Sequence, residues 1–104
     1  MRKTEIEAWT EEWNEQYLLE KSVLKSVFTD DLVHIFHIGS TSIPTIGYAK
    51  PIIDILIVVN NIDKVDLYNS QMTALGYMPK GENGIEGRRY FSKGKNQKTH
   101  HVHI

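Results

Sequence analysis

One apolar segment constrains the fold of this chain more than any other feature. Residues 52–59 read IIDILIVV, and Asp54 is the only polar side chain among them. The segment is rich in β-branched residues and far shorter than the roughly 20 apolar residues of a membrane-spanning helix, so it predicts a central strand buried on both faces. An unpartnered carboxylate would be costly there, so Asp54 is either a paired structural residue or a metal-binding and catalytic one.

Helical and strand patterns surround this segment. Apolar residues at helical spacing predict one helix over 10–28 and a second over 60–75, capped by Asn60 and ended by Gly76. β-rich runs predict further strands over 32–38, 77–80, 88–93 and 99–104. This order predicts an α+β fold, a mixed β-sheet with flanking helices, in a single domain over residues 1–104.

Composition excludes several classes of function. Twelve basic against thirteen acidic side chains give a formal charge of −1, whereas a domain that binds nucleic acid electrostatically is normally basic. The absence of cysteine excludes disulfides, thiolate metal sites and cysteine nucleophiles. The N-terminal sequence lacks the apolar core of a secretion signal, so we expect a cytoplasmic protein without a membrane segment.

The last predicted strand bears on assembly. The sequence stops inside the strand predicted over 99–104, and no closing helix follows. We therefore expect this strand to be a sheet edge unless further elements are missing. An exposed edge strand could pair with a second copy of the chain and form a homodimer.

A hydroxyl-rich turn follows the strand predicted over 32–38. Gly39 lets the backbone approach an anion closely, and Ser40, Thr41 and Ser42 add three hydroxyl groups. Backbone N–H groups in such a turn can bind phosphate oxygens. The same residues are also common in ordinary turns, so the turn alone does not decide its function.

The turn and Asp54 together give a more specific pattern. Thirteen residues separate Ser40 from Asp54, and this spacing resembles the signature of the nucleotidyltransferase superfamily. The resemblance implies that the Gly-Ser turn holds the phosphates of a nucleotide and that carboxylates on the next strand bind a divalent metal, Mg²⁺ or Mn²⁺. That strand normally carries a second acid where this chain has Leu56, so a two-metal site cannot be built from this strand alone.

Four longer motifs resemble the GrpB family. They are HIGSTSIP (37–44), AKPIIDILI (49–57), GENGIEGRRYF (81–91) and THHVHI (99–104). The resemblance covers nearly the whole chain and implies a nucleotidyltransferase-like fold, but the biochemical activity of the family is not established. Its members typically continue past the last motif with further helices, so we expect this chain to be a truncated member.

Histidine and lysine side chains near these motifs could line the same pocket. His101 and His103 lie two apart on one strand face and could bind a metal, line the pocket or form a solvated surface. His37 precedes the turn and is either a pocket residue or a structural one. Lys50 could pair with a phosphate or with Asp54.

Two arginines and one glutamate complete the candidates. Arg88 and Arg89 follow a glycine-rich loop and either form a solvated surface pair or bind a phosphate; only one of them is expected to reach it because successive strand residues point to opposite faces. Glu20 interrupts the apolar stripe of the first helix. It either supplies a missing carboxylate to the pocket or lies at its rim with its charge in water.

Three functions remain open at this point. The first is a metal-dependent nucleotidyltransferase in which Asp54 is the catalytic and metal-binding residue. The second is a module that binds a nucleotide or another phosphorylated small molecule without turnover, because Leu56 replaces an acid. The third is a metal site centred on His101 and His103 with no nucleotide.

Overall fold

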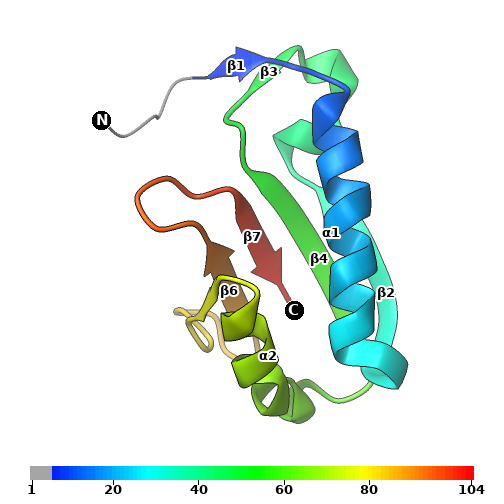
Figure 1. Ribbon diagram of the computed structural model, residues 1–104, viewed down its shortest axis with the longest axis vertical. Helices are drawn as coiled ribbons and strands as arrows, with labels where there is room; N and C mark the ends of the chain where they lie inside the picture. Colours follow the sequence, from blue (N-terminus) through cyan, green and yellow to red (C-terminus); the bar gives the residue numbers. More distant parts are fainter. Residues whose placement is uncertain (1–5) are drawn as a thin grey trace.

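The computed structural model describes residues 6–104 and contains two α-helices and seven strands in this part of the chain (Figure 1). The helices are α1 (Glu12–Phe28) and α2 (Asn69–Ala74). The strands are β1 (Glu7–Ala8), β2 (Leu32–Ile38), β3 (Tyr48–Ala49), β4 (Ile53–Val59), β5 (Tyr77–Pro79), β6 (Tyr90–Lys93) and β7 (His100–His103). Short 3₁₀ segments connect them: η1 (Thr29–Asp31), η2 (Ser40–Ser42), η3 (Pro44–Ile46) and η4 (Ile62–Tyr68).

The first helix follows the predicted apolar stripe. Trp13, Tyr17, Leu24 and Val27 are buried on one side of α1, and Glu20 is buried among them. The helix begins after Thr10, whose hydroxyl accepts a hydrogen bond from the backbone N–H of residue 12 at 3.2 Å. Within residues 6–104, neither this helix nor any other is long and apolar enough to cross a membrane.

The second predicted helix is split into two shorter pieces. Residues 62–68 form the 3₁₀ segment η4, and only 69–74 continue as the α-helix α2. The predicted cap is also wrong by one residue, because the side chain of Asn61 accepts from the N–H of Asp63. The Asn60 side chain instead donates to the carbonyl of Asp30 at 3.2 Å, which ties it to the loop before β2. Gly76 ends this region with a φ of 97°, as predicted.

Five strands form the main sheet in the order β2-β4-β7-β6-β5. The pairing of β4 with β7 is parallel, and the other three pairings are antiparallel. The last strand therefore lies inside the sheet between β4 and β6, and the prediction of a β7 edge open to a second copy is wrong. The edges are β2 and β5, while β1 and β3 form a separate two-stranded sheet.

Both helices cover the same face of this sheet. Phe28 at the end of α1 contacts Tyr68 at the end of η4, with ring centroids 5.0 Å apart. Beneath them lie the alternate β4 residues Ile53, Ile55 and Ile57, all fully buried. Burying each of these side chains contributes about 2 kcal/mol to stability.

The other face of the sheet, which we call the open face, carries Phe36, Asp54, Leu56, Val58 and Met78. Here Phe36 is 46% exposed and Met78 is 58% exposed. The prediction that the apolar strand is buried on both faces is therefore wrong. Buried and more exposed side chains alternate along β4 instead, because α1 and α2 cover only one face of the sheet. Asp54 therefore lies outside the core.

Candidate functional site

Gly39 brings the hydroxyl-rich turn against Asp54. The two strands β2 and β4 pair so that Ile38 lies opposite Asp54, and Gly39 follows at once with φ 75° and ψ −174°. A Cβ atom built on Gly39 would lie 2.7 Å from Oδ2 of Asp54, which is closer than atoms of this kind can approach. Only glycine allows both this backbone conformation and this contact.

A cavity of about 420 Å³ opens beside this contact. Two residues of the turn, Ser40 and Thr41, line it together with Asp54, Lys50 and His101. The rest of its lining is Ile6, Tyr48, Ala49 and Ile52. The predicted turn, the predicted carboxylate, one predicted cation and one predicted histidine therefore share one cavity.

Thr41 and His37 hold the shape of the turn. The hydroxyl of Thr41 is fully buried, donates to the carbonyl of Ile52 at 3.4 Å and lies 2.9 Å from Nε2 of His37. The carbonyl of Thr41 accepts from Nε1 of Trp9 at 3.0 Å. The ring of His37 stacks on Tyr17 with centroids 4.7 Å apart. Thr41 and His37 thus fix the turn to α1 and to β4.

Burial lowers the pKa of His37, and the nearby charge of Asp54 opposes that change only in part. A neutral imidazole therefore faces Thr41 at neutral pH. Ser42 also serves the turn, since its hydroxyl donates to the carbonyl of Gly39 at 2.5 Å. Of the three hydroxyls, that of the exposed Ser40 is the one we find free to meet a ligand.

Two histidines of β7 lie next to Asp54. The parallel register places His101 opposite Asp54 and His103 opposite Leu56, all on the open face. Oδ1 of Asp54 lies 3.4 Å from Nδ1 of His101 and 3.7 Å from Nε2 of His103. Burial lowers the pKa of His103, although the charge of Asp54 opposes this, so its ring is predominantly neutral at pH 7.

These three side chains do not enclose an ion by themselves. Among residues 6–104, no three histidine, aspartate or glutamate side chains are arranged to hold a metal. The prediction of a metal site centred on His101 and His103 alone therefore finds no support in the geometry. A cation at Asp54 would need further ligand atoms from a bound molecule or from water.

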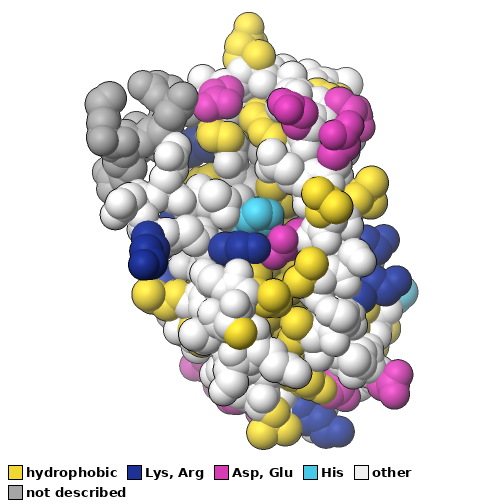
Figure 2. Space-filling view, in the orientation of Figure 1, with side chains coloured by type: hydrophobic (Ala, Val, Ile, Leu, Met, Phe, Trp, Pro, Cys, Tyr) yellow, Lys and Arg dark blue, Asp and Glu magenta, His cyan; other side chains and the backbone are white. Residues whose placement is uncertain are grey.

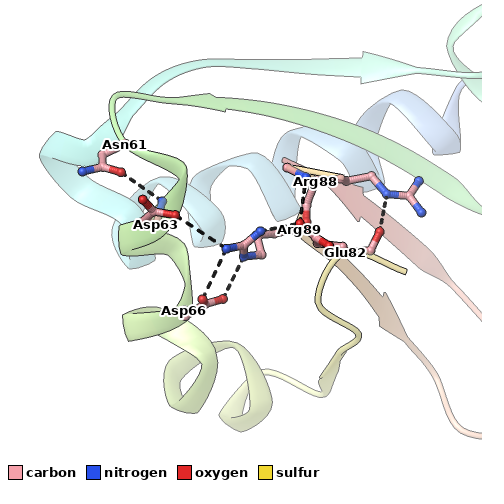
Figure 3. Close-up of polar contacts among 7 residues, drawn as sticks. Asn61, Asp63, Asp66, Glu82, Arg88 and Arg89 are labelled. Atoms are coloured by element: carbon pink, nitrogen blue, oxygen red, sulfur yellow. Dashed lines mark hydrogen bonds and ion pairs between the residues drawn. The ribbon is translucent and has the colours of Figure 1, made fainter. Parts of the chain in front are cut away.

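The two arginines have different surroundings. Arg89 lies 3.0 Å from Asp66 and 3.9 Å from Asp63, both in η4. Arg88 instead donates to the backbone carbonyls of Glu82 and Asn83 at 3.2 and 2.8 Å. Figure 3 shows the two guanidinium groups pointing in opposite directions. Arg89 is therefore committed to a surface ion pair away from the cavity.

Arg88 contacts Tyr90, whose side chain lies on the open face. Its guanidinium lies over the ring of Tyr90 at 5.0 Å from the ring centroid. The same ring contacts His101 and His103, with centroids 5.6 and 5.0 Å apart. Of the two arginines, Arg88 is thus the one on the side of Asp54, and its contact with a phosphate stays a prediction.

Glu20 lies on the other side of the sheet, away from the cavity. Its Oε2 accepts from the hydroxyl of Tyr77 at 2.6 Å and from Nζ of Lys93 at 3.0 Å, and its Oε1 lies 3.9 Å from Nε2 of His100. On the face of the molecule that carries the helices, acidic, basic and histidine side chains lie next to one another near the centre of the view (Figure 2). The prediction that Glu20 lines the Asp54 pocket is not supported, because α1 covers the opposite face.

Several groups act on the charge of Glu20. Burial raises its pKa, but the hydrogen bonds from Tyr77 and Lys93, with the nearby His100, outweigh burial, and the net pKa is lowered. Burial and the hydrogen bond to Glu20 together raise the pKa of Tyr77 far above its usual range. Glu20 is therefore an ionised carboxylate that joins α1 to the strands β5, β6 and β7.

Comparison with known proteins decides the family. Residues 3–104 match the family described as GrpB protein. The chain belongs to the GrpB family. It is 42% identical to a chain in a structure titled "Crystal structure of conserved protein GrpB from Enterococcus faecalis", with a TM-score of 0.92 over 96% of this chain and 60% of that one.

Two curated GrpB relatives show the same partial coverage. UPF0157 protein YqkA of Bacillus subtilis is 56% identical over 103 residues, which are 99% of this chain and 30% of that protein. Glutamate-rich protein GrpB of Alkalihalophilus pseudofirmus is 33% identical over 100 residues, 91% of this chain and 57% of that protein. The chain thus spans less than two thirds of the length of these relatives.

Sequence reasoning missed two residues that lie next to the histidines of β7. Tyr90 connects Arg88 to both histidines, and the side chain of Ser92 lies on the same face of β6, opposite His101. Both follow Arg88 at alternating positions, so the strand period could have pointed to them. The contacts themselves depend on the pairing of β6 with β7, which cannot be predicted from the spacing of residues in the sequence.

Proposed function

We propose that this GrpB protein binds the phosphate groups of a nucleotide or another phosphorylated small molecule in the cavity between the turn and Asp54. The observation that carries this proposal is the contact of Gly39 with Asp54, which places a hydroxyl-rich turn and a carboxylate in one cavity with Lys50. Ser40 and Lys50 would bind phosphate oxygens. Arg88 would neutralise charge on a second phosphate near Tyr90.

The donor set at Asp54 suits Mg²⁺ or Mn²⁺ only together with such a ligand. Mg²⁺ commonly binds one or two carboxylates, keeps several waters and takes its other oxygens from substrate phosphates. Asp54 is partly exposed at the cavity and supplies one carboxylate. Asp54 would hold such a cation, whose charge would offset the negative charge of the carboxylate and of the bound phosphates.

Nucleotidyl transfer is the reaction that this arrangement would serve. An acceptor oxygen would attack the α-phosphorus, the bond from that phosphorus to the departing pyrophosphate would break, and the acceptor would lose its proton. The neutral ring of His103, 3.7 Å from Asp54, is suited to take that proton. Lys50 and Arg88 would balance the charge of the phosphates.

Leu56 favours a second candidate, a module that binds the same ligand without turnover. Leu56 points to the open face two residues after Asp54, where the superfamily signature has its second acid. Without that carboxylate the strand offers one metal ligand, and reactions that use two metals lose one of them. Binding and turnover therefore need separate measurements.

Binding is tested by thermal unfolding with Mg²⁺ and a series of ATP, ADP, AMP and pyrophosphate. A ligand at a hundred times its Kd stabilises the folded state by about 2.7 kcal/mol, or about 12 °C for a domain of this size. We expect Asp54→Asn to lose most of this shift and Asp30→Asn, which alters an exposed aspartate away from the cavity, to keep it. Equal shifts in Asp54→Asn and wild type would refute the proposed role of Asp54.

Turnover is tested by pyrophosphate release from nucleoside triphosphates with hydroxyl and phosphate acceptors. Release that disappears in Asp54→Asn supports the transferase. Ligand binding that depends on Asp54, with no release across the acceptors, supports the module without turnover.

A further inference from the structure

Ser92 is a buried hydroxyl without a partner. Its side chain is 2% exposed, and it is the one buried side-chain polar atom in residues 6–104 that makes no hydrogen bond. Buried polar groups in folded proteins nearly always have a hydrogen-bond partner, so such an exception needs a physical explanation. Nothing in the proposed phosphate site uses this hydroxyl.

The sheet places Ser92 beside His101. The two residues lie directly opposite each other in the pairing of β6 with β7. Phe91 is buried in the core and Lys93 reaches Glu20, so Ser92 lies with Tyr90 on the open face. Directly opposed side chains on one face have Cβ atoms about 4.5–5.5 Å apart, which is within reach of a hydrogen bond from a hydroxyl to an imidazole.

His101 has a loose contact on its other side. Its Nδ1 lies 3.4 Å from Oδ1 of Asp54, which is longer than a strong charge-assisted hydrogen bond of about 2.8 Å. A cation on Asp54 would repel a proton on the ring nitrogen that faces the carboxylate. His101 would then need a different partner, and the unpartnered hydroxyl of Ser92 is its neighbour across the sheet.

We propose that Ser92 is a positioning residue that holds His101 when Asp54 takes up a cation. A hydroxyl can donate to the unprotonated ring nitrogen or accept from the protonated one, so it suits either tautomer. His101 is then held away from the cation, and the hydroxyl gains the hydrogen bond that it otherwise lacks. The cation step of this proposal rests on the proposed function, whereas the pairing of Ser92 with His101 does not.

The first experiment compares wild type with Ser92→Ala, Ser92→Cys and the control Ser70→Ala, an exposed serine of α2. Without ligand, we expect Ser92→Ala to melt no lower than wild type, because removing an unsatisfied buried hydroxyl costs nothing. With Mg²⁺ and pyrophosphate, we expect its Kd to be about three- to tenfold weaker, the worth of one hydrogen bond. Ser92→Cys keeps the volume but donates weakly, so it should behave like Ser92→Ala.

The second experiment needs no ligand. Asp54→Ala removes the other partner of His101, so the ring should turn to Ser92. We expect the ¹⁵N shifts of the His101 ring, measured at pH 8, to move in Asp54→Ala and to return toward free-imidazole values in Asp54→Ala with Ser92→Ala.

The outcomes separate this inference from the proposed function. The positioning role is refuted, while the phosphate site stands, if pyrophosphate binds equally well to wild type and Ser92→Ala. It is also refuted if the ¹⁵N shifts of the His101 ring are the same in Asp54→Ala with and without Ser92→Ala. If no protein binds Mg²⁺ and pyrophosphate, the proposed function fails, and the ¹⁵N experiment alone decides the pairing of Ser92 with His101.

Discussion

Replacing Gly39 with alanine should disturb the fold and the site together. The backbone at Gly39 has φ 75° and ψ −174°, a region that is almost restricted to glycine and costs other residues about 1–3 kcal/mol. The added Cβ would also lie 2.7 Å from Oδ2 and 3.2 Å from Cβ of Asp54, so the carboxylate must move. We expect a total loss of about 3 kcal/mol in the free energy of unfolding.

Thermal and urea unfolding measure this loss. A chain of 104 residues has an unfolding entropy of about 0.22 kcal/mol/K, so about 3 kcal/mol lowers the Tm by about 14 °C. Gly47→Ala is the matched control, because Gly47 also has a positive φ, of 86°, but a Cβ there meets no atom within 4 Å. Because ψ is −33° at Gly47 and −174° at Gly39, this control accounts for the positive φ, and the double-mutant cycle with Asp54→Ala isolates the contact.

A double-mutant cycle with Asp54→Ala tests the cause directly. Asp54→Ala removes the oxygen that the new Cβ meets, so Gly39→Ala should cost at least about 1 kcal/mol less in that background. The same cycle between Gly47→Ala and Asp54→Ala should show no coupling. Equal costs for the two glycine variants, together with additive free energies in both cycles, would refute the close approach of the turn to the carboxylate.

Three further predictions follow from the charges. Burial lowers the pKa of both His37 and His103, so the unfolded chain binds protons more readily than the folded one. The Tm should therefore fall as the pH is lowered from about 7 to about 5.5, and His37→Asn should flatten this dependence. An unchanged slope in His37→Asn would contradict the prediction. Glu20→Gln weakens a partly buried ion pair and should lower stability by about 2 kcal/mol in urea unfolding at pH 7. Because the pKa of Glu20 is lowered in the folded state, this loss should shrink as the pH falls through the acidic range in which the wild-type carboxylate takes up a proton. Arg89→Met should cost less than about 1 kcal/mol and leave pyrophosphate binding, measured by isothermal titration calorimetry with Mg²⁺, unchanged. Arg88→Met should weaken that binding, and equal effects of the two variants would contradict the assignment of Arg88 to the site.

Much of the local structure could be predicted because its causes are local. The strand β2 has the predicted bounds, and β4 begins one residue later than predicted. The resemblance of the spacing between Ser40 and Asp54 to a known signature linked the turn to Asp54, and the two lie close together because β2 and β4 are antiparallel neighbours in the main sheet. A turn at the end of one strand then necessarily lies near the start of the next.

The predictions that were wrong concern which helices and strands cover each face of the sheet. The apolar run of β4 cannot reveal that its helices all lie on one side, so Val58 was expected in the core and is exposed. The stripe of the first helix makes Glu20 a candidate for the pocket or its rim, but it does not reveal the face of the sheet on which α1 packs. The place of β7 inside the sheet was missed for the same reason, since strand order is set by tertiary packing.

The insertion of β7 between β4 and β6 has a consequence for how the molecule assembles. Until His100–His103 arrive, the chain can form only two separate ribbons, β2 with β4 and β5 with β6. Because this closing step joins segments that are distant in sequence, it is expected to be slow relative to the local pairings. Insertion of β7 therefore completes the sheet and brings the histidines to Asp54 in one step, and before that step the facing edges of β4 and β6 are open to mispairing.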